Sequence, residues 1–197
     1  MARTIAKDYS EKRAHILKTA ARVFAEQGFA RASMTQVAQE CGISKANIYH
    51  YYSGKDALLF DILDSYLATL RDRLATVPEE GSAEKRFSAL VREALLAYEG
   101  MDHEHQIQTE GLPLLPQEQQ ETLRGYQRDM VGQFSSVLTE IAPDVFEGDA
   151  RKLRAATMSV FGMLNWFYMW NRSAGTEARE DYAKLVARMT LGGVGSI

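Results

Sequence analysis

Hydroxyl, amide, imidazole and ammonium side chains crowd one short stretch of the sequence, residues 33–55 (SMTQVAQECGISKANIYHYYSGK). A lysine can bond to guanine or to a phosphate, an asparagine can pair with adenine, and tyrosine and histidine can donate hydrogen bonds to phosphate oxygens. The stretch therefore holds the kinds of group that could bind nucleic acid. Its polar candidates are Ser33, Thr35, Gln36, Lys45, Asn47, Tyr49, His50, Tyr51 and Lys55.

Two short helices are expected to position these side chains. Ser33 and Gln36 stand three residues apart, as a capping box requires, and so begin the first helix. Apolar residues of that helix share one face, and Gly42 ends it. Ser44 is placed to cap a second helix that runs through Tyr49. Two short helices across a tight turn with a glycine make a helix-turn-helix.

Longer helices are expected on both sides of this motif. The first, residues 10–27, has apolar residues at helical spacing, and its Phe24 and Phe29 are expected to seal a small core. Residues 1–8, with Arg3 and Lys7, are expected to form a mobile arm. The helix that follows the motif, residues 55–74, should extend for about 30 Å and link two domains.

Several motifs of residues 16–59 occur together, in order: A-x-x-x-F-x-x-x-G-F from residue 20, TQVA from residue 35, CGISKANIYHYY from residue 41 and K-x-x-L-L from residue 55. With these motifs the stretch resembles the amino-terminal DNA-binding domain of the TetR family of transcriptional regulators. Motifs in this order over about fifty residues are more specific than a single helix-turn-helix pattern. The remaining 130 or so residues resemble the family only in length and helical character.

The resemblance implies which side chains of the second short helix point outward. The inward residues would be Ile48 and Tyr52, and the outward ones Lys45, Ala46, Asn47, Tyr49 and His50. Thr35 with Gln36, and Lys55, would add contacts to phosphate from the two flanking helix starts. Two alternatives stay open: Tyr51 simply packs against its neighbours, and His50 is an ordinary surface histidine.

Charge is distributed unevenly along the chain. The 197 residues carry a net charge of −3, yet residues 1–55 hold 9 Lys or Arg against 4 Asp or Glu, and the remainder has a net charge of −8. A basic head on an acidic body suits a protein that docks on phosphate with one end. A chance fluctuation among solvated faces is the alternative on charge alone.

Composition predicts an all-α protein of about nine helices. Proline is scarce, and alanine, leucine, glutamate, glutamine and arginine dominate. We expect a helix-turn-helix domain over residues 10–55, a linking helix over 55–75 and a helical effector-binding and dimerisation domain over 76–197. The longest apolar stretch, residues 155–170, is short for a membrane span. The amino terminus lacks the apolar segment of a signal peptide, and a single cysteine excludes an internal disulfide. A cytoplasmic protein is expected.

Residue patterns of known enzymes are absent from the sequence. It contains no G-x-S-x-G, no Walker loop, no H-E-x-x-H and only four scattered histidines, so we expect no catalytic residues and no cofactor. The spacing of His103 and His105 beside Glu104 could suggest a metal, but no second ligand cluster accompanies it. The alternatives for residues 101–117, the least regular part, are a solvated connection and part of a pocket entrance.

The carboxy-terminal half contains an unusual run, FGMLNWFYMWNR, within the helix expected over residues 149–172. That helix is apolar on nearly every side, so one flank should be covered by a second subunit, together with the last helix, 177–191. In one interpretation the run belongs to the core and to the dimer interface, with Asn165 hydrogen-bonded to a neighbouring helix. The other makes a pocket for an apolar effector, lined by Tyr98, Met101, Phe161, Asn165, Trp166 and Tyr168.

A dimeric, effector-responsive regulator is the function these features favour. One short recognition helix gives too small an interface, so a two-fold homodimer on a palindromic operator is expected. The run near residue 165 resembles that of TetR-family regulators of acyl-CoA degradation, which suggests an acyl-CoA or a related effector that releases a repressor from DNA. The alternative is an adaptor that binds protein through its helical bundle and has a vestigial DNA-binding head.

Overall fold

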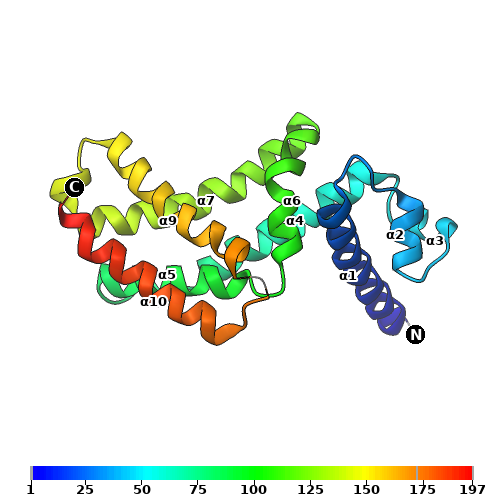
Figure 1. Cartoon of the computed structure of the whole chain (residues 1–197), viewed down its shortest axis with the longest axis horizontal. Coiled ribbons are helices and arrows are strands. Elements are labelled where there is room, and N and C mark those ends of the chain that lie inside the picture. Colours follow the sequence, from blue (N-terminus) through cyan, green and yellow to red (C-terminus); the bar gives the residue numbers. More distant parts are fainter. Residues whose placement is uncertain (1, 172, 197) are drawn as a thin grey trace. The chain divides into compact units, whose positions relative to one another are not determined.

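The computed structural model describes residues 2–171 and 173–196, with side chains from residue 8 onward. These residues form ten α-helices and two 3-10 turns and contain no strand, which confirms the all-α prediction (Figure 1). One helix, α8, is a single turn that begins at a proline. The helices are α1 (Ala2–Gln27), α2 (Met34–Glu40), α3 (Lys45–Tyr51), α4 (Lys55–Ala75), α5 (Ala83–Ala97), α6 (Asp102–Gly111), α7 (Gln117–Ile141), α8 (Pro143–Phe146), α9 (Ala150–Trp170) and α10 (Thr176–Gly193), and the turns are η1 (Leu112–Leu114) and η2 (Val194–Ser196).

The chain divides into two compact units. The first holds residues 1–66 and 103–123, and the second holds 67–102 and 124–197. Both α4 and α7 therefore contribute residues to both units. The domain boundaries expected from the sequence stay a prediction. No helix among the described residues is long and apolar enough to cross a membrane.

Helix α1 is longer than the sequence analysis predicted. It begins at Ala2 and not at Ser10, so the expected mobile arm is helical in its described part. The segment ARTIAKDY contains neither glycine nor proline, and Lys12 pairs with Asp8 one turn away, at 2.7 Å. These features favour continuation of the helix. The side chains of Arg3 and Lys7 lie outside the described residues.

The core of the first unit is apolar and forms where α1, α2, α3 and the start of α4 meet. Phe24 is buried and packs edge to face on Phe29, with ring centroids 5.2 Å apart, as predicted. Gly28 follows α1 with a φ of +81°, a left-handed conformation that glycine adopts at little cost. Other core side chains of this region include Ile16, Ala20, Val37, Ala38, Ile48, Leu58, Leu59 and Ile62.

Residues 101–117, which the sequence analysis described as the least regular part, contain helix α6. Within the first unit α6 packs against α4, where the Tyr66 hydroxyl lies 2.6 Å from Nδ1 of His105. A Cβ on Gly111 would come within 3.0 Å of the Leu59 side chain, so the absence of a side chain permits this close approach. The Gln106 amide also donates to the carbonyl of Ala25, at the end of α1. The periodicity of apolar residues in the sequence does not indicate these long-range contacts.

The second unit is a helical bundle in which α5 and α10 pack along one another. Aromatic side chains fill its interior: Phe87 and Phe134 meet edge to face at 6.1 Å, and Phe134 also packs on Phe161. Helix α9 begins at Ala150, capped by Asp149, whose carboxylate accepts from the Lys152 amide at 2.9 Å. The expected end of this helix, Arg172, lies outside the described residues.

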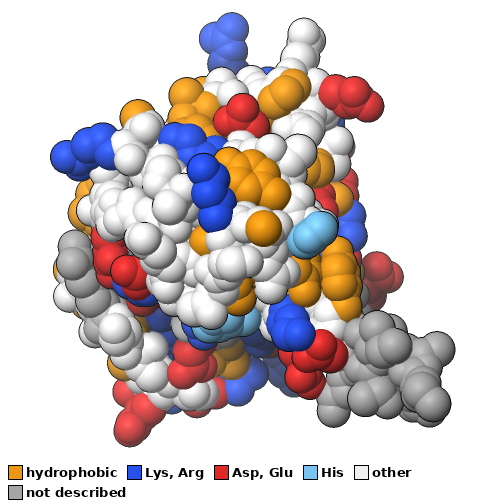
Figure 2. All heavy atoms as spheres, turned by 90° about the vertical axis from the view of Figure 1, so that its right-hand side faces the viewer, with side chains coloured by type: hydrophobic (Ala, Val, Ile, Leu, Met, Phe, Trp, Pro, Cys, Tyr) orange, Lys and Arg blue, Asp and Glu red, His pale blue; other side chains and the backbone are white. Residues whose placement is uncertain are grey.

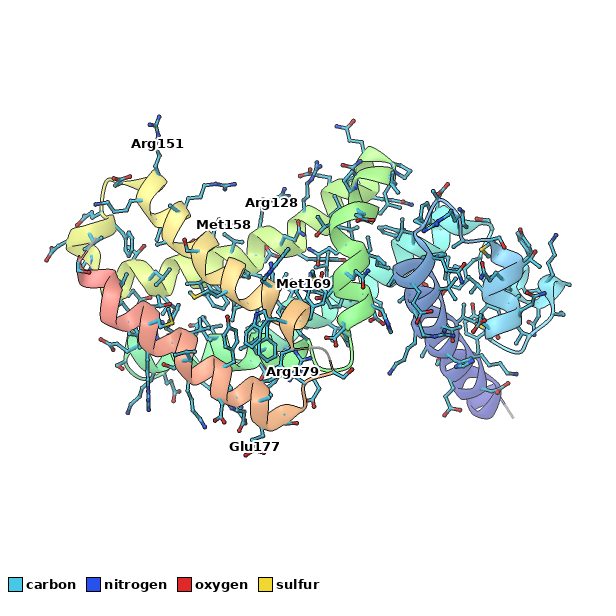
Figure 3. All side chains as sticks on the ribbon, viewed as in Figure 1. Arg128, Arg151, Met158, Met169, Glu177 and Arg179 are labelled. Atoms are coloured by element: carbon cyan, nitrogen blue, oxygen red, sulfur yellow. The ribbon has the colours of Figure 1, made fainter. Side chains whose placement is uncertain are left out.

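One guanidinium is buried among these helices. The Arg179 side chain, 1% exposed, donates to the carbonyls of Ala174 and Leu95 and pairs with Asp102 at 3.2 Å (Figure 3). It also lies over the Phe167 ring, 5.6 Å from its centroid. A buried charge is tolerated when such partners satisfy it. Arg179 thus joins α10 to the end of α5 and to the first residue of α6.

Candidate nucleic-acid interface

The α2–turn–α3 segment forms because both of its helix starts are capped. The Ser33 hydroxyl accepts from the backbone N–H of Gln36 at 3.2 Å, and the Ser44 hydroxyl accepts from the backbone N–H of Asn47 at 3.1 Å. Between the helices Gly42 adopts a φ of +67°, which a residue with a Cβ adopts only with strain. The helix-turn-helix predicted from these serines and this glycine is confirmed.

Helix α3 presents a polar face to solvent and an apolar one to the core. Ile48 is fully buried and Tyr52, just beyond the helix, is buried too. Four of the outward residues are exposed, namely Lys45, Ala46, Tyr49 and His50. The fifth, Asn47, is half-buried. This is the orientation the resemblance implied. Figure 2 looks onto the right-hand side of the view in Figure 1, where hydrophobic, basic, acidic and histidine side chains are interspersed.

A partly buried hydrogen-bond network anchors the end of α3. The Tyr52 hydroxyl donates to Asp61 Oδ2 at 2.5 Å, and Arg13 forms an ion pair with the other oxygen of the same carboxylate. Burial and the hydrogen bond to Asp61 raise the pKa of the Tyr52 hydroxyl, which therefore stays protonated. Helices α1 and α4 thus hold α3 in place through one carboxylate.

Tyr51, the last residue of α3, packs as the alternative interpretation suggested. Its ring stacks on that of Tyr9 from α1, with centroids 4.9 Å apart and planes inclined by 18°. Tyr51 remains half-buried, so packing and a contact with phosphate are compatible. Sequence analysis missed Tyr9, because this residue was assigned to the junction of the expected arm and helix.

Lys55 has a structural role that the sequence did not indicate. Its ammonium donates to the carbonyls of Phe29 and Ala30, at 2.7 and 3.2 Å, and lies 4.7 Å from the centroid of the Phe29 ring. The start of α4 is thereby tied to the α1–α2 connection. The contact of Lys55 with phosphate stays a prediction.

At the start of α2, Thr35 is exposed and Gln36 is half-buried. Ser33, which is exposed, uses its hydroxyl to cap the helix. Ser33, Thr35 and Gln36 lie together at the start of α2, because Ser33 is its N-cap and the other two residues belong to its first turn. Their contacts with DNA also stay predictions.

The residues proposed to line an effector pocket are distributed over the interior and the surface of the second unit. Tyr98, at the end of α5, donates its hydroxyl to Oδ1 of Asn165 on α9 at 2.9 Å, and burial raises the pKa of that hydroxyl. Phe161 is buried against Phe134. Met101 and Tyr168 are half-buried, and Trp166 is 62% exposed. The bond from Asn165 to a neighbouring helix agrees with the first interpretation of this run.

Fold and site together define an all-helical protein with a capped helix-turn-helix at one end of the chain and a helical bundle after it. The chain matches two family models, "Bacterial regulatory proteins, tetR family" over residues 16–62 and "Tetracyclin repressor-like, C-terminal domain" over residues 80–194. The second match covers more than half of the chain. The chain belongs to the TetR family.

Individual relatives agree with this assignment. The chain is 35% identical over 71 residues to the HTH-type transcriptional regulator YerO of Bacillus subtilis (strain 168), a match to 36% of this chain and 25% of YerO. Its fold is similar to that of a TetR-family transcriptional regulator from Bordetella parapertussis 12822, with a TM-score of 0.84 and 28% identity over 90% of this chain and 93% of that one.

A third relative was solved with ligands. The structure of AibR in complex with isovaleryl coenzyme A and operator DNA has a TM-score of 0.75 to this chain, with 23% identity over 90% of this chain and 97% of AibR. At that identity the likeness concerns the fold.

The matched family, YerO and the Bordetella protein are all described as regulators of transcription. The prediction that the chain is not an enzyme is therefore confirmed.

Proposed function

We propose that this protein is a cytoplasmic, effector-responsive repressor that binds a palindromic operator as a homodimer. The observation that carries the proposal is helix α3, whose buried Ile48 fixes it to the core while Lys45, Tyr49 and His50 face solvent. These donors suit base edges and phosphates. The proposed DNA-binding residues are Ser33, Thr35, Gln36, Lys45, Ala46, Asn47, Tyr49, His50, Tyr51 and Lys55.

Dimerisation is supported by apolar side chains exposed on the last two long helices. Large apolar residues that soluble proteins usually bury are 42–62% exposed here, and Figure 3 labels two of them on α9. They are Met158, Trp166, Met169 and Trp170 on α9, and Leu185 and Met189 on α10. A second copy of the chain would cover both helices and supply the second recognition helix.

The dimer is tested by placing a charge on this face. Trp166→Glu and Met189→Glu should convert the dimer to a monomer in sedimentation experiments, because a buried carboxylate without a partner is costly. Leu114→Glu is the matched control, since Leu114 is an exposed apolar residue on η1. If both interface variants remain dimers, another surface holds the two copies together.

The proposed effector class is an acyl-CoA thioester, which has an apolar acyl group, or a related small apolar compound. Tyr98 and Asn165 provide a polar pair among apolar neighbours, as a site for such a ligand needs for orientation, and AibR, of similar fold, was solved with isovaleryl coenzyme A. The proposed lining is Tyr98, Met101, Phe161, Asn165, Trp166 and Tyr168. An effector releases DNA only if it binds better to a dimer with wrongly spaced recognition helices, and α4, continuous from residue 55 to 75, would carry the change.

Selection of bound sequences from random double-stranded DNA tests the DNA-binding function. We expect a palindrome whose affinity falls with salt and is lost in Tyr49→Ala. Selection of no DNA would overturn this function and favour the adaptor. With the operator known, mobility shifts with and without a series of acyl-CoAs test the effector. Binding that none of them changes would count against this class.

A further inference from the structure

Helix α1 reaches the end of the recognition helix through Tyr9, whose ring stacks on that of Tyr51. Tyr9 lies four residues before Arg13 and seven before Ile16, so the three side chains share one face of α1. Ile16 is buried in the core and Arg13 pairs with Asp61, which also holds Tyr52. The same face of α1 therefore carries the anchor of α3 and, further out, Tyr9.

Tyr9 makes a directed contact although half of its side chain is exposed. The side chain is 50% exposed, yet its ring lies nearly parallel to that of Tyr51, at 18° and 4.9 Å between centroids. Offset stacking at this distance is favourable for aromatic pairs. Beside the stack, α1 and α3 line a hollow, to which α1 contributes Asp8, Lys12 and His15 and α3 contributes Asn47.

Helix α3 needs support of this kind because it is only seven residues long. Isolated helices of that length are unstable in water, so contacts with the rest of the protein must fix the helix. Ser44 fixes its start, Ile48 its middle, and the Tyr52 hydroxyl the residue after its end. Tyr51 itself is half-buried, and its ring contacts that of Tyr9 in the stack.

We propose that Tyr9 is a positioning residue, which orders the Tyr51 side chain for its contact with DNA without contacting DNA itself. This inference depends on the proposed DNA-binding function. A side chain that is ordered before binding loses less rotational freedom on binding, which is worth about a two- to tenfold gain in affinity per ordered side chain.

A double-mutant cycle on operator affinity tests the proposal. Tyr9→Leu removes the ring and should weaken binding about two- to tenfold for each half-site that the dimer occupies. Tyr9→Phe keeps the ring and should bind as the wild type does. In a Tyr51→Leu background, Tyr9→Leu should cause no further loss, because Tyr9 acts through Tyr51. Thermal unfolding of each variant shows that the fold is retained.

The Tyr9 hydroxyl separates positioning from direct contact, because the stack needs only the ring, whereas a hydrogen bond to phosphate needs the O–H. If Tyr9 orders Tyr51 only, Tyr9→Phe binds the operator as tightly as the wild type does. Additive losses in the cycle, or a Tyr9→Phe variant as weak as Tyr9→Leu, would overturn the positioning role while leaving DNA binding intact. A wild type that selects no DNA would overturn both.

Discussion

The two compact units of this chain are stabilised in different ways. At the helix-turn-helix, neighbours in sequence set where the helices begin and where the chain turns: the Ser33 and Ser44 hydroxyls accept from backbone N–H groups three residues further on, and Gly42 makes the turn. In the second unit, Arg179 bonds to Leu95 and Asp102, which lie 84 and 77 residues away. The first arrangement can be recognised by family and sequence pattern, whereas the second appears only when the helices have packed.

The largest effect is expected where an aromatic side chain is removed from the small core of the first unit. Phe24→Ala should lower the free energy of unfolding by about 3–5 kcal/mol, because Phe24 is 1% exposed and its loss leaves a cavity beside Phe29. Urea denaturation measures the change. Phe29→Ala is the comparison, since Phe29 is half-buried and should cost less. Equal losses would show that the core does not centre on Phe24.

A somewhat smaller loss is expected from the buried guanidinium of the second unit. Arg179→Ala should cost about 3 kcal/mol, since it leaves two carbonyls and the Asp102 carboxylate, 24% exposed, without their donor. Lys184→Ala removes a solvent-exposed pair with Asp181 and should change stability by less than about 0.5 kcal/mol. A loss below about 1 kcal/mol for Arg179→Ala would mean that the network is satisfied in other ways.

These two predictions also mark what the sequence could and could not provide. Helical periods and caps predicted α2, α3, the apolar core and the fold class. Arginine is usually exposed, so the burial of Arg179 had no signal in a single sequence. Helix α6 was missed for a similar reason: its stabilising contacts, from Tyr66 and Leu59 of α4 and from Ala25 of α1, come from far away in the chain.

For the candidate site, residue types were predictable and their partners were not. The resemblance identified which face of α3 is outward, and burial agrees. The bonds of Lys55 to two carbonyls and the stack of Tyr51 on Tyr9 depend on how α1 lies against α3 and α4. Spacing along one helix contains no information on such contacts between helices.

Lys55 allows the structural and DNA-binding roles to be measured separately. An ammonium has three N–H donors, and two carbonyls accept from it in the structure. Lys55→Met should therefore lower the free energy of unfolding by about 1–2 kcal/mol. If Lys55 also neutralises one phosphate in each protomer of the dimer, the salt slope of operator binding falls by about 1.8. A loss of stability with an unchanged slope would leave Lys55 with its structural role alone.

The smallest effect concerns the helix caps, which both units share. Ser44→Ala should cost about 1 kcal/mol, because the Asn47 amide loses its acceptor at the start of α3. Ser82→Ala is the matched variant in the second unit, where the serine hydroxyl accepts from the Lys85 amide at 3.4 Å, a longer and weaker bond than the 3.1 Å one at Ser44. Chemical denaturation should thus give a smaller loss for Ser82→Ala. If Ser82→Ala lowers the free energy of unfolding by more than Ser44→Ala does, local capping matters as much in the bundle as in the helix-turn-helix. The contrast between the two units would then lie only in Arg179 and its partners.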